Sequence, residues 1–169
     1  ADFFITSRRM RGKKPIALVN SSHLRTFIDV LLEDDDIETE IKVAIILCIS
    51  GGLRVSEMLS IKKKDIQRDG EYMFIKTNVL KKRRKETRWI RIYPTAQTFI
   101  ETFIENKIGE TIVNYSQSGL YRALQRIFGI EGLCNHSFRH SLISELLFGQ
   151  HLTIIECAKL VSVSIGIIE

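Results

Sequence analysis

Cysteine is scarce in this sequence, and its three residues, Cys48, Cys134 and Cys157, lie far apart. An odd number of scattered thiols excludes a disulfide framework and favours a reducing cytoplasm. Long apolar runs are also lacking, because the run over residues 41–49 is interrupted by Lys42 and is too short to cross a membrane. No cleavable signal is visible. The sequence therefore predicts a cytoplasmic protein with no membrane partner.

Patterns for nucleotide and metal binding are missing as well. The chain contains neither G-x-G-x-x-G nor G-x-x-x-x-G-K-[ST], and its pair Gly51-Gly52 follows a predicted helix, whereas nucleotide loops follow a strand. His136, His140 and His151 have no matching cluster of thiols or carboxylates. We therefore expect no metal site and no glycine-rich nucleotide loop.

Positive charge is abundant and unevenly distributed. The formal net charge is +5, and the acids gather in one short run over residues 33–36. The basic residues form three clusters, which are Arg8, Arg9, Arg11, Lys13 and Lys14, then Lys62, Lys63 and Lys64, then Lys81, Lys82, Arg83, Arg84, Lys85 and Arg88. Such segregation is typical of a protein that follows the phosphates of a nucleic acid, although each cluster alone could also be a solvated loop or tail.

Hydrophobic periodicity predicts a mainly α-helical domain with a small antiparallel β-sheet. Residues 1–20 read as a basic arm or linker, and residues 21–169 as one domain. Apolar stripes predict helices over about 24–32, 38–50, 55–61, 95–104, 120–128, 138–147 and 153–160. Residues 72–77 and 89–93 alternate instead, with Ile90 and Ile92 on one face, so they predict a hairpin whose tip is the third basic cluster.

Arg54 is the first candidate site residue. It follows the glycine pair that ends a helix with apolar residues nearly all round, so it would emerge from a rigid support. Its planar guanidinium can grip two phosphate oxygens, and Glu57 lies three residues further on. The alternative interpretation is an exposed arginine that merely pairs with Glu57.

The sequence from His136 to His140 is the second candidate. His136 and Arg139 are three residues apart at a predicted helix start, so they share a face, while Phe138 points into the core. The first turn of a helix presents unpaired N–H groups that favour an anion. Histidine can move a proton near neutral pH, and arginine can stabilise charge on a phosphate. Such pairs are also common on ordinary helix surfaces.

These pieces occur in a specific order: G-G-L-R-x-S-E, then a basic hairpin, then H-x-x-R-H. In that order they resemble the catalytic domain of the tyrosine recombinases, the phage integrase family, from about Ser21 to Glu169. The resemblance implies a mainly helical fold with a three-stranded sheet, whose third strand would lie near residues 65–68. It also implies double-stranded DNA as partner, a tetramer on two DNA sites for the full-length protein, and no metal or nucleotide cofactor.

The resemblance also assigns roles to residues. Arg54 and Arg139 look like the two arginines that clamp the scissile phosphate, His136 like the histidine that assists proton movement, and Glu57 like the acidic support. A hairpin lysine that protonates the leaving 5′ oxygen would be Lys81, or Lys82 as second choice. Further contacts to DNA are expected from the basic arm and the hairpin tip, which contribute Arg8, Arg9, Arg11, Lys13, Lys14, Lys82, Arg83, Arg84 and Lys85.

Two departures from the family pattern stand near the end of the chain. Ser162 occupies the place of the family's second histidine, and the nucleophilic tyrosine would fall beyond Glu169. Tyr115 and Tyr121 precede the H-x-x-R motif, and Tyr121 fits a core stripe. We therefore expect this chain to clamp DNA without cleaving it. Two alternatives remain: a DNA-binding relative that lost catalysis and acts as a regulator, and an unrelated helical scaffold with basic loops.

Overall fold

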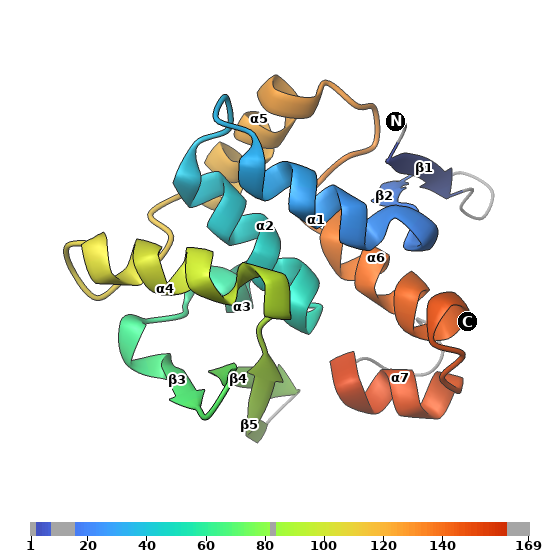
Figure 1. Ribbon diagram of the computed structural model, residues 1–169. Helices are drawn as coiled ribbons and strands as arrows, with labels where there is room; N and C mark the ends of the chain where they lie inside the picture. Colours follow the sequence, from blue (N-terminus) through green and yellow to red (C-terminus); the bar gives the residue numbers. More distant parts are fainter. Residues whose placement is uncertain (1–2, 8–15, 82–83, 162–169) are drawn as a thin grey trace.

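The computed structural model describes residues 3–7, 16–81 and 84–161. In this part the helices pack around one central helix, and a three-stranded sheet closes one end of the molecule (Figure 1). The helices are α1 (Leu24–Glu33), α2 (Thr39–Gly51), α3 (Val55–Leu59), α4 (Gln97–Asn106), α5 (Gln117–Phe128), α6 (Ser137–Ser144) and α7 (Ile154–Val161). The strands are β1 (Phe4–Ser7), β2 (Ile16–Val19), β3 (Ile66–Asp69), β4 (Tyr72–Lys81) and β5 (Arg84–Arg91).

The central helix is α2, as the nearly continuous apolar pattern predicts. Every residue from Ile41 to Ile49 is buried. Lys42, which interrupts that pattern, is 4% exposed, and its amine donates to the carbonyl of Leu32 at 3.2 Å and lies over the ring of Phe99. A buried ammonium group needs such partners, because desolvation without them costs several kcal/mol, on the order of the penalty for any unpaired buried ion.

Two glycines end α2 and bring it against the sheet. Gly52 adopts a left-handed conformation with φ of 61°, which only glycine reaches without strain. A side-chain carbon on Gly51 would overlap the side chain of Ile90 in β5. The glycine pair therefore serves both to turn the chain and to let the sheet approach the helix end.

The N-terminal segment differs from the predicted arm. β1 and β2 pair in antiparallel register, and Ala17 and Val19 in β2 are fully buried in the main core. The backbone N–H of Ala17 donates to Gly132, and that of Val19 donates to the hydroxyl of Ser141 in α6 at 2.8 Å. Residues 16–19 thus pack into the same core as the helices that follow residue 20. The short apolar segment was masked in the sequence by its basic neighbours.

The three-stranded sheet has the order β3-β4-β5, and the third strand lies where it was predicted, at Ile66–Asp69. Its hairpin is longer than the alternating pattern indicated: the register runs from Phe74 opposite Arg91 to Lys81 opposite Arg84. Most of the predicted basic tip is therefore strand. Backbone pairing between β4 and β5 continues regardless of side-chain polarity, which explains why the periodic pattern ended before the strands did.

Of two other predictions from the sequence, the capping box before α7 is confirmed and the core position of Tyr121 is wrong. Thr153 and Glu156 form the predicted capping box, with the amide of Glu156 donating to the Thr153 hydroxyl at 3.1 Å. Tyr121, predicted as core, is 45% exposed on α5, because Leu120 and Leu124 already fill the buried side of that helix. In the described part of the chain no helix is long and apolar enough to span a membrane.

The reactivity of Cys48 tests how well the core around α2 is protected from solvent. It is 3% exposed in α2, and burial raises the pKa of its thiol to about 12. Since the thiolate is the reactive form, we expect roughly 1,000-fold less thiolate than at an ordinary cysteine, before any steric protection is counted. Labelling with a thiol reagent, followed site by site by mass spectrometry, should modify the half-buried Cys134 first. Equal rates at the two sites would show that the core opens readily.

Candidate phosphate-binding site

The glycine turn after α2 places Arg54 at the start of α3. Arg54 has an extended backbone, and its N–H donates to the carboxylate of Glu57 at 2.8 Å. The second carboxylate oxygen of Glu57 lies 3.7 Å from the Arg54 guanidinium. Glu57 is 9% exposed, whereas the Arg54 side chain is 37% exposed. A buried carboxylate thus orients an arginine that still presents part of its fork to solvent.

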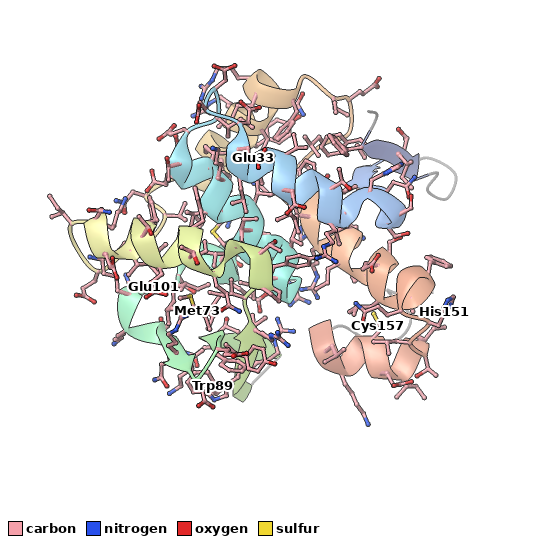
Figure 2. The ribbon with its side chains drawn as sticks, viewed as in Figure 1. Glu33, Met73, Trp89, Glu101, His151 and Cys157 are labelled. Carbon is pink, nitrogen blue, oxygen red and sulfur yellow. The ribbon has the colours of Figure 1, made fainter. Side chains whose placement is uncertain are left out.

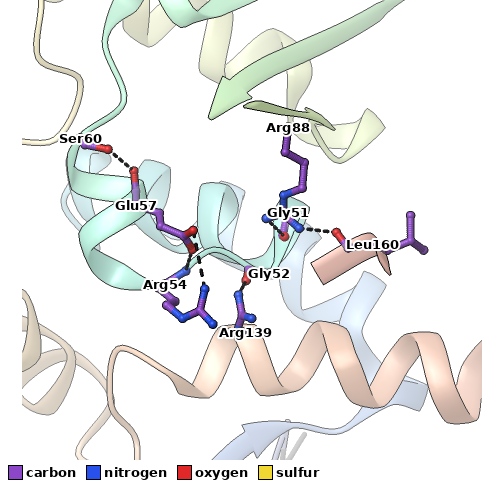
Figure 3. Close-up of polar contacts among 8 residues, drawn as sticks. All are labelled: Gly51, Gly52, Arg54, Glu57, Ser60, Arg88, Arg139 and Leu160. Atoms are coloured by element: carbon purple, nitrogen blue, oxygen red, sulfur yellow. Dashed lines mark hydrogen bonds and ion pairs between the residues drawn. The ribbon is translucent and has the colours of Figure 1, made fainter. Parts of the chain in front are cut away.

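Arg139 approaches the same turn from α6. It is only 4% exposed, and its guanidinium donates to the carbonyl oxygen of Gly52 (Figure 3). Burial, and next the positive charge of Arg54, lower the pKa of Arg139 to about 10. The two predicted arginines, Arg54 and Arg139, are 85 positions apart in the chain. The fold brings both of them to the same glycine turn.

Arg88 is a third arginine at this turn, and the sequence analysis did not select it for the site. One of its terminal nitrogens donates to the carbonyl of Gly51 at 3.1 Å, and the other donates to the carbonyl of Leu160 in α7. Burial lowers its pKa, with Glu57 opposing and Arg54 adding to this effect. The sequence did hold a signal: Arg88 shares the phase of Ile90, whose face is buried.

The electrostatic balance of the site is strongly positive. Arg54 lowers the pKa of both Arg88 and Arg139, and Arg88 lowers that of Arg139, so the three guanidinium groups repel one another. In the described part of the chain, Glu57 is the carboxylate that offsets both Arg88 and Arg139. Cations held close together in partly desolvated surroundings attract an anion strongly. The arrangement is chemically suited to a phosphate group.

His136 lies at the N-terminal cap of α6, three residues before Arg139. It is exposed, and its ring centre is 6.4 Å from that of His140. The predicted position of H-x-x-R at a helix start is thus confirmed, while the role of His136 stays a prediction. Tyr115 lies apart from this group, because its hydroxyl donates to Glu38 at 2.6 Å and this bond raises its pKa to about 12.

The other predicted site residues lie at the limits of the described chain. Lys81 ends β4 and Arg84 and Lys85 begin β5, but their side chains lie outside the described part. Outside the described residues altogether are Arg8, Arg9, Arg11, Lys13, Lys14, Lys82, Arg83 and Ser162. The hairpin lysine and the serine at the second-histidine position therefore remain predictions.

Comparison with known proteins gives a family match and similar folds. The model of the phage integrase family matches residues 19–151. The fold is similar to the XerH site-specific recombinase bound to its difH substrate in a pre-cleavage complex, with a TM-score of 0.70 and 18% identity over 89% of this chain and 48% of that one. It is also similar to the Tn1549 transposon integrase in complex with circular intermediate DNA, with a TM-score of 0.65 and 13% identity over 93% of this chain and 62% of that one.

The post-cleavage complex of XerH on a palindromic difH substrate matches equally well, with a TM-score of 0.71 and 18% identity over 92% of this chain and 49% of that one. The chain thus spans about half the length of the XerH structures. A sequence comparison with curated proteins gave no match. The predicted fold class, mainly α with a small antiparallel sheet, is confirmed, and the unrelated helical scaffold is excluded.

Proposed function

This chain belongs to the phage integrase family, and from this premise we propose that it is the catalytic domain of a tyrosine recombinase. Such an enzyme breaks and rejoins double-stranded DNA at specific sites through a 3′-phosphotyrosyl intermediate. The observation that carries the proposal is the meeting of Arg54 and Arg139 at the glycine turn, beside the carboxylate of Glu57. An excess of oriented guanidinium groups matches the extra negative charge of a phosphate under attack.

The proposed reaction uses these groups as follows. A tyrosine oxygen attacks the phosphorus, and the bond from phosphorus to the 5′ oxygen breaks. Arg54 and Arg139 donate to the two non-bridging oxygens as their charge grows, and His136 takes up the tyrosine proton. A hairpin lysine, Lys81 or else Lys82, gives a proton to the leaving 5′ oxygen. Attack of a 5′ hydroxyl on the phosphotyrosine reverses these transfers and rejoins the strand.

Two residues would act on the site through others. Glu57 holds both the backbone and the guanidinium of Arg54, so it fixes the direction of that fork. Arg88 binds the carbonyls of Gly51 and Leu160, so it connects the hairpin and α7 to the turn that supports Arg54 and Arg139. Both are positioning residues in this proposal, because their contacts are to the protein.

We further propose the partners and surroundings of the domain. XerH and the Tn1549 integrase are bound to DNA in the structures named above, which supports DNA as the partner of this chain. The full-length protein would assemble as a tetramer on two DNA sites. Sedimentation of the longer protein with two copies of its target site would test this assembly.

Substitution of Arg54 tests the phosphate clamp directly. Arg54→Gln should bind a DNA duplex of mixed sequence about 10- to 150-fold more weakly, since a charge-assisted hydrogen bond contributes about 1.5–3 kcal/mol. Fluorescence anisotropy over a salt series gives both the affinity and its salt slope, which should fall by about 1 for each lost phosphate contact. Arg126→Gln, which removes an exposed charge from α5, is the matched control. If both variants bind like the parent chain, the clamp is refuted.

The chemical step needs a longer form of the protein that carries the tyrosine. On a nicked duplex with the cognate site, we expect a covalent adduct in which the 3′ phosphate is joined to tyrosine. DNA binding without any adduct would instead support the regulator that has lost catalysis. A version with Ser162→His would then show whether the serine at that position is responsible.

A further inference from the structure

A basic groove opens on the outer face of the three-stranded sheet, away from the core. Its volume is about 520 Å³. In the register of the hairpin, Lys76 lies opposite Trp89 and Asn78 opposite Thr87, and these residues alternate with the buried Ile75 and Ile90. They therefore point to the face that α2 does not cover. Lys62 and Lys64, which precede β3, close the other side of the groove.

The chemistry of this groove suits a hydrated anion. Three lysines line it, namely Lys62, Lys64 and Lys76, together with the amides of Gln67 and Asn78 and the hydroxyl of Thr87. The single carboxylate in the lining, that of Asp65, already accepts the backbone N–H of Lys62 at 2.9 Å. No apolar side chain is among the described residues that line the groove, whereas pockets for small organic ligands are mostly apolar.

The lysines differ in how firmly they are held. Lys62 is half-buried, and its amine donates to the hydroxyl of Thr111 at 3.2 Å, so the position of this side chain is fixed. Lys64 and Lys76 are exposed. Their long side chains can follow a phosphate as point charges, which is how lysine contacts a nucleic-acid backbone.

The short helix α3 links the groove to the arginine site, with Arg54 at its start and Ser60 at its end. Ser60 lines the groove, and its hydroxyl donates to the carbonyl of Glu57 at 2.8 Å (Figure 3). From Arg54 to Ser60 the chain advances about 9 Å, at about 1.5 Å per helical residue. This distance corresponds to roughly two or three phosphates of one DNA strand, at about 3.4 Å per phosphate along the axis.

We propose that this groove binds the phosphate backbone of DNA two or three nucleotides from the phosphate clamped by Arg54 and Arg139. The proposal rests on the proposed function, and it adds the second basic cluster of the sequence to the DNA-binding surface. Strands β4 and β5 line the groove, and the proposed catalytic lysine belongs to the hairpin that they form. A DNA backbone bound in the groove would therefore hold β4 and β5 in place while Lys81 or Lys82 gives its proton to the leaving oxygen.

An adjoining hollow of about 300 Å³ has a different character. Phe74 and Trp89 line it, and Trp89 is 48% exposed at the lower edge of the molecule (Figure 2). Exposed aromatic side chains are typical of protein interfaces. A second copy of the chain is therefore the competing occupant, and the experiment below must separate it from DNA.

The test compares two double variants that lose the same charge. Lys64→Gln with Lys76→Gln alters the groove, and Arg25→Gln with Arg126→Gln removes two exposed charges from α1 and α5, which lie away from the sheet (Figure 1). Binding to a duplex of mixed sequence is measured over a salt series. The groove variant should lower the salt slope by about 2 and the control by much less. Thermal melting should be unchanged in both, since surface substitutions of this kind alter stability little.

The failures can be told apart. If the groove variant and its control have the same affinity and salt slope while Arg54→Gln weakens binding, the groove proposal is overturned and the proposed function stands. If Arg54→Gln also leaves the DNA affinity and the salt slope unchanged, the proposed function itself is overturned, and the groove proposal that rests on it is overturned too. If the groove variant changes the oligomeric state in sedimentation and leaves DNA affinity unchanged, the groove belongs to a second copy of the chain.

Discussion

An Arg139→Met variant should bind DNA about 10- to 150-fold more weakly and yet unfold no more easily than the parent chain. The loss of affinity follows from the removal of a charge-assisted contact to phosphate worth about 1.5–3 kcal/mol. The stability follows from burial. Folding disfavours the charged Arg139, since its folded pKa of about 10 lies below the ordinary value of a guanidinium. Because the folded pKa is lowered, this cost is present at neutral pH and is relieved only as the pH rises above about 10.

Methionine has a similar length and carries no charge, so it removes both the desolvation cost and the repulsion from Arg54 and Arg88. Replacing a whole buried ion pair by apolar groups of matching size is often neutral or stabilising by about 1–4 kcal/mol, whereas removing one partner is costly when the other is left unpaired. Glu57 keeps Arg54 and Arg88 as its cations, so Arg139→Met leaves no buried charge unpaired. The hydrogen bond to Gly52 is lost and limits the gain. Urea unfolding and DNA anisotropy on the same samples test both halves. A variant that is destabilised by several kcal/mol, on the order of a cavity mutation, would show that Arg139 is mainly structural.

A Phe138→Ala variant should have the opposite profile. Phe138 precedes Arg139 in α6 but faces the core, where it is 2% exposed and stacks on Phe27 at 6.2 Å between ring centres. Truncation of such a side chain costs about 3–5 kcal/mol, and for a chain of this size each kcal/mol lowers the melting temperature by about 2–4 °C. We therefore expect a melting temperature lowered by roughly 6–20 °C. The fraction that remains folded should bind DNA with the parent affinity.

Phe138→Leu is the graded control, because it keeps an apolar side chain at the contact of α6 with α2 and should cost much less. Differential scanning calorimetry gives the melting temperatures, and DNA binding is measured well below them. A Phe138→Ala chain that melts within a few degrees of the parent would contradict the packing described here. If both expectations hold, Phe138 stabilises the domain and the adjacent Arg139 provides the site.

The parts of the fold that were predictable are those with a strong period. The buried helix α2, the start of α6 at His136 and the core face of β5 all follow from apolar spacing of 3.6 or 2 residues. β1 and β2 were missed because four-residue strands beside a basic run show no period of their own. Their burial depends on partners far along the chain, such as Ser141, which a local pattern cannot indicate.

The sequence predicted which residues form the arginine site better than it predicted their hydrogen-bond partners. Arg54, Glu57 and Arg139 were selected from the order of the motifs, and the structure brings all three to one turn. That Arg139 would bind the carbonyl of Gly52 was not predictable, because the pairing depends on how α6 crosses α2. Arg88 was passed over since it stood among exposed-looking basic residues, although its position two residues before the buried Ile90 places both side chains on the inner face.

The last helix is attached differently from the rest of the domain. The apolar contacts of α7 belong to a second, small cluster around Ile143, Leu146 and Cys157, which is separate from the main core (Figure 2 labels Cys157). Arg88 connects it to the arginine site by a hydrogen bond to the carbonyl of Leu160. Arg139 also lies close to Cys157: burial raises the pKa of that thiol, and the charge of Arg139 opposes the rise. Regions with few buried apolar contacts open at lower free energy than the core, as independent cooperative units. Since Arg54 and Arg139 are anchored on the glycine turn, we expect opening of α7 to leave these two arginines in place. Under the proposed function, DNA binding and docking of α7 would then be thermodynamically separable steps.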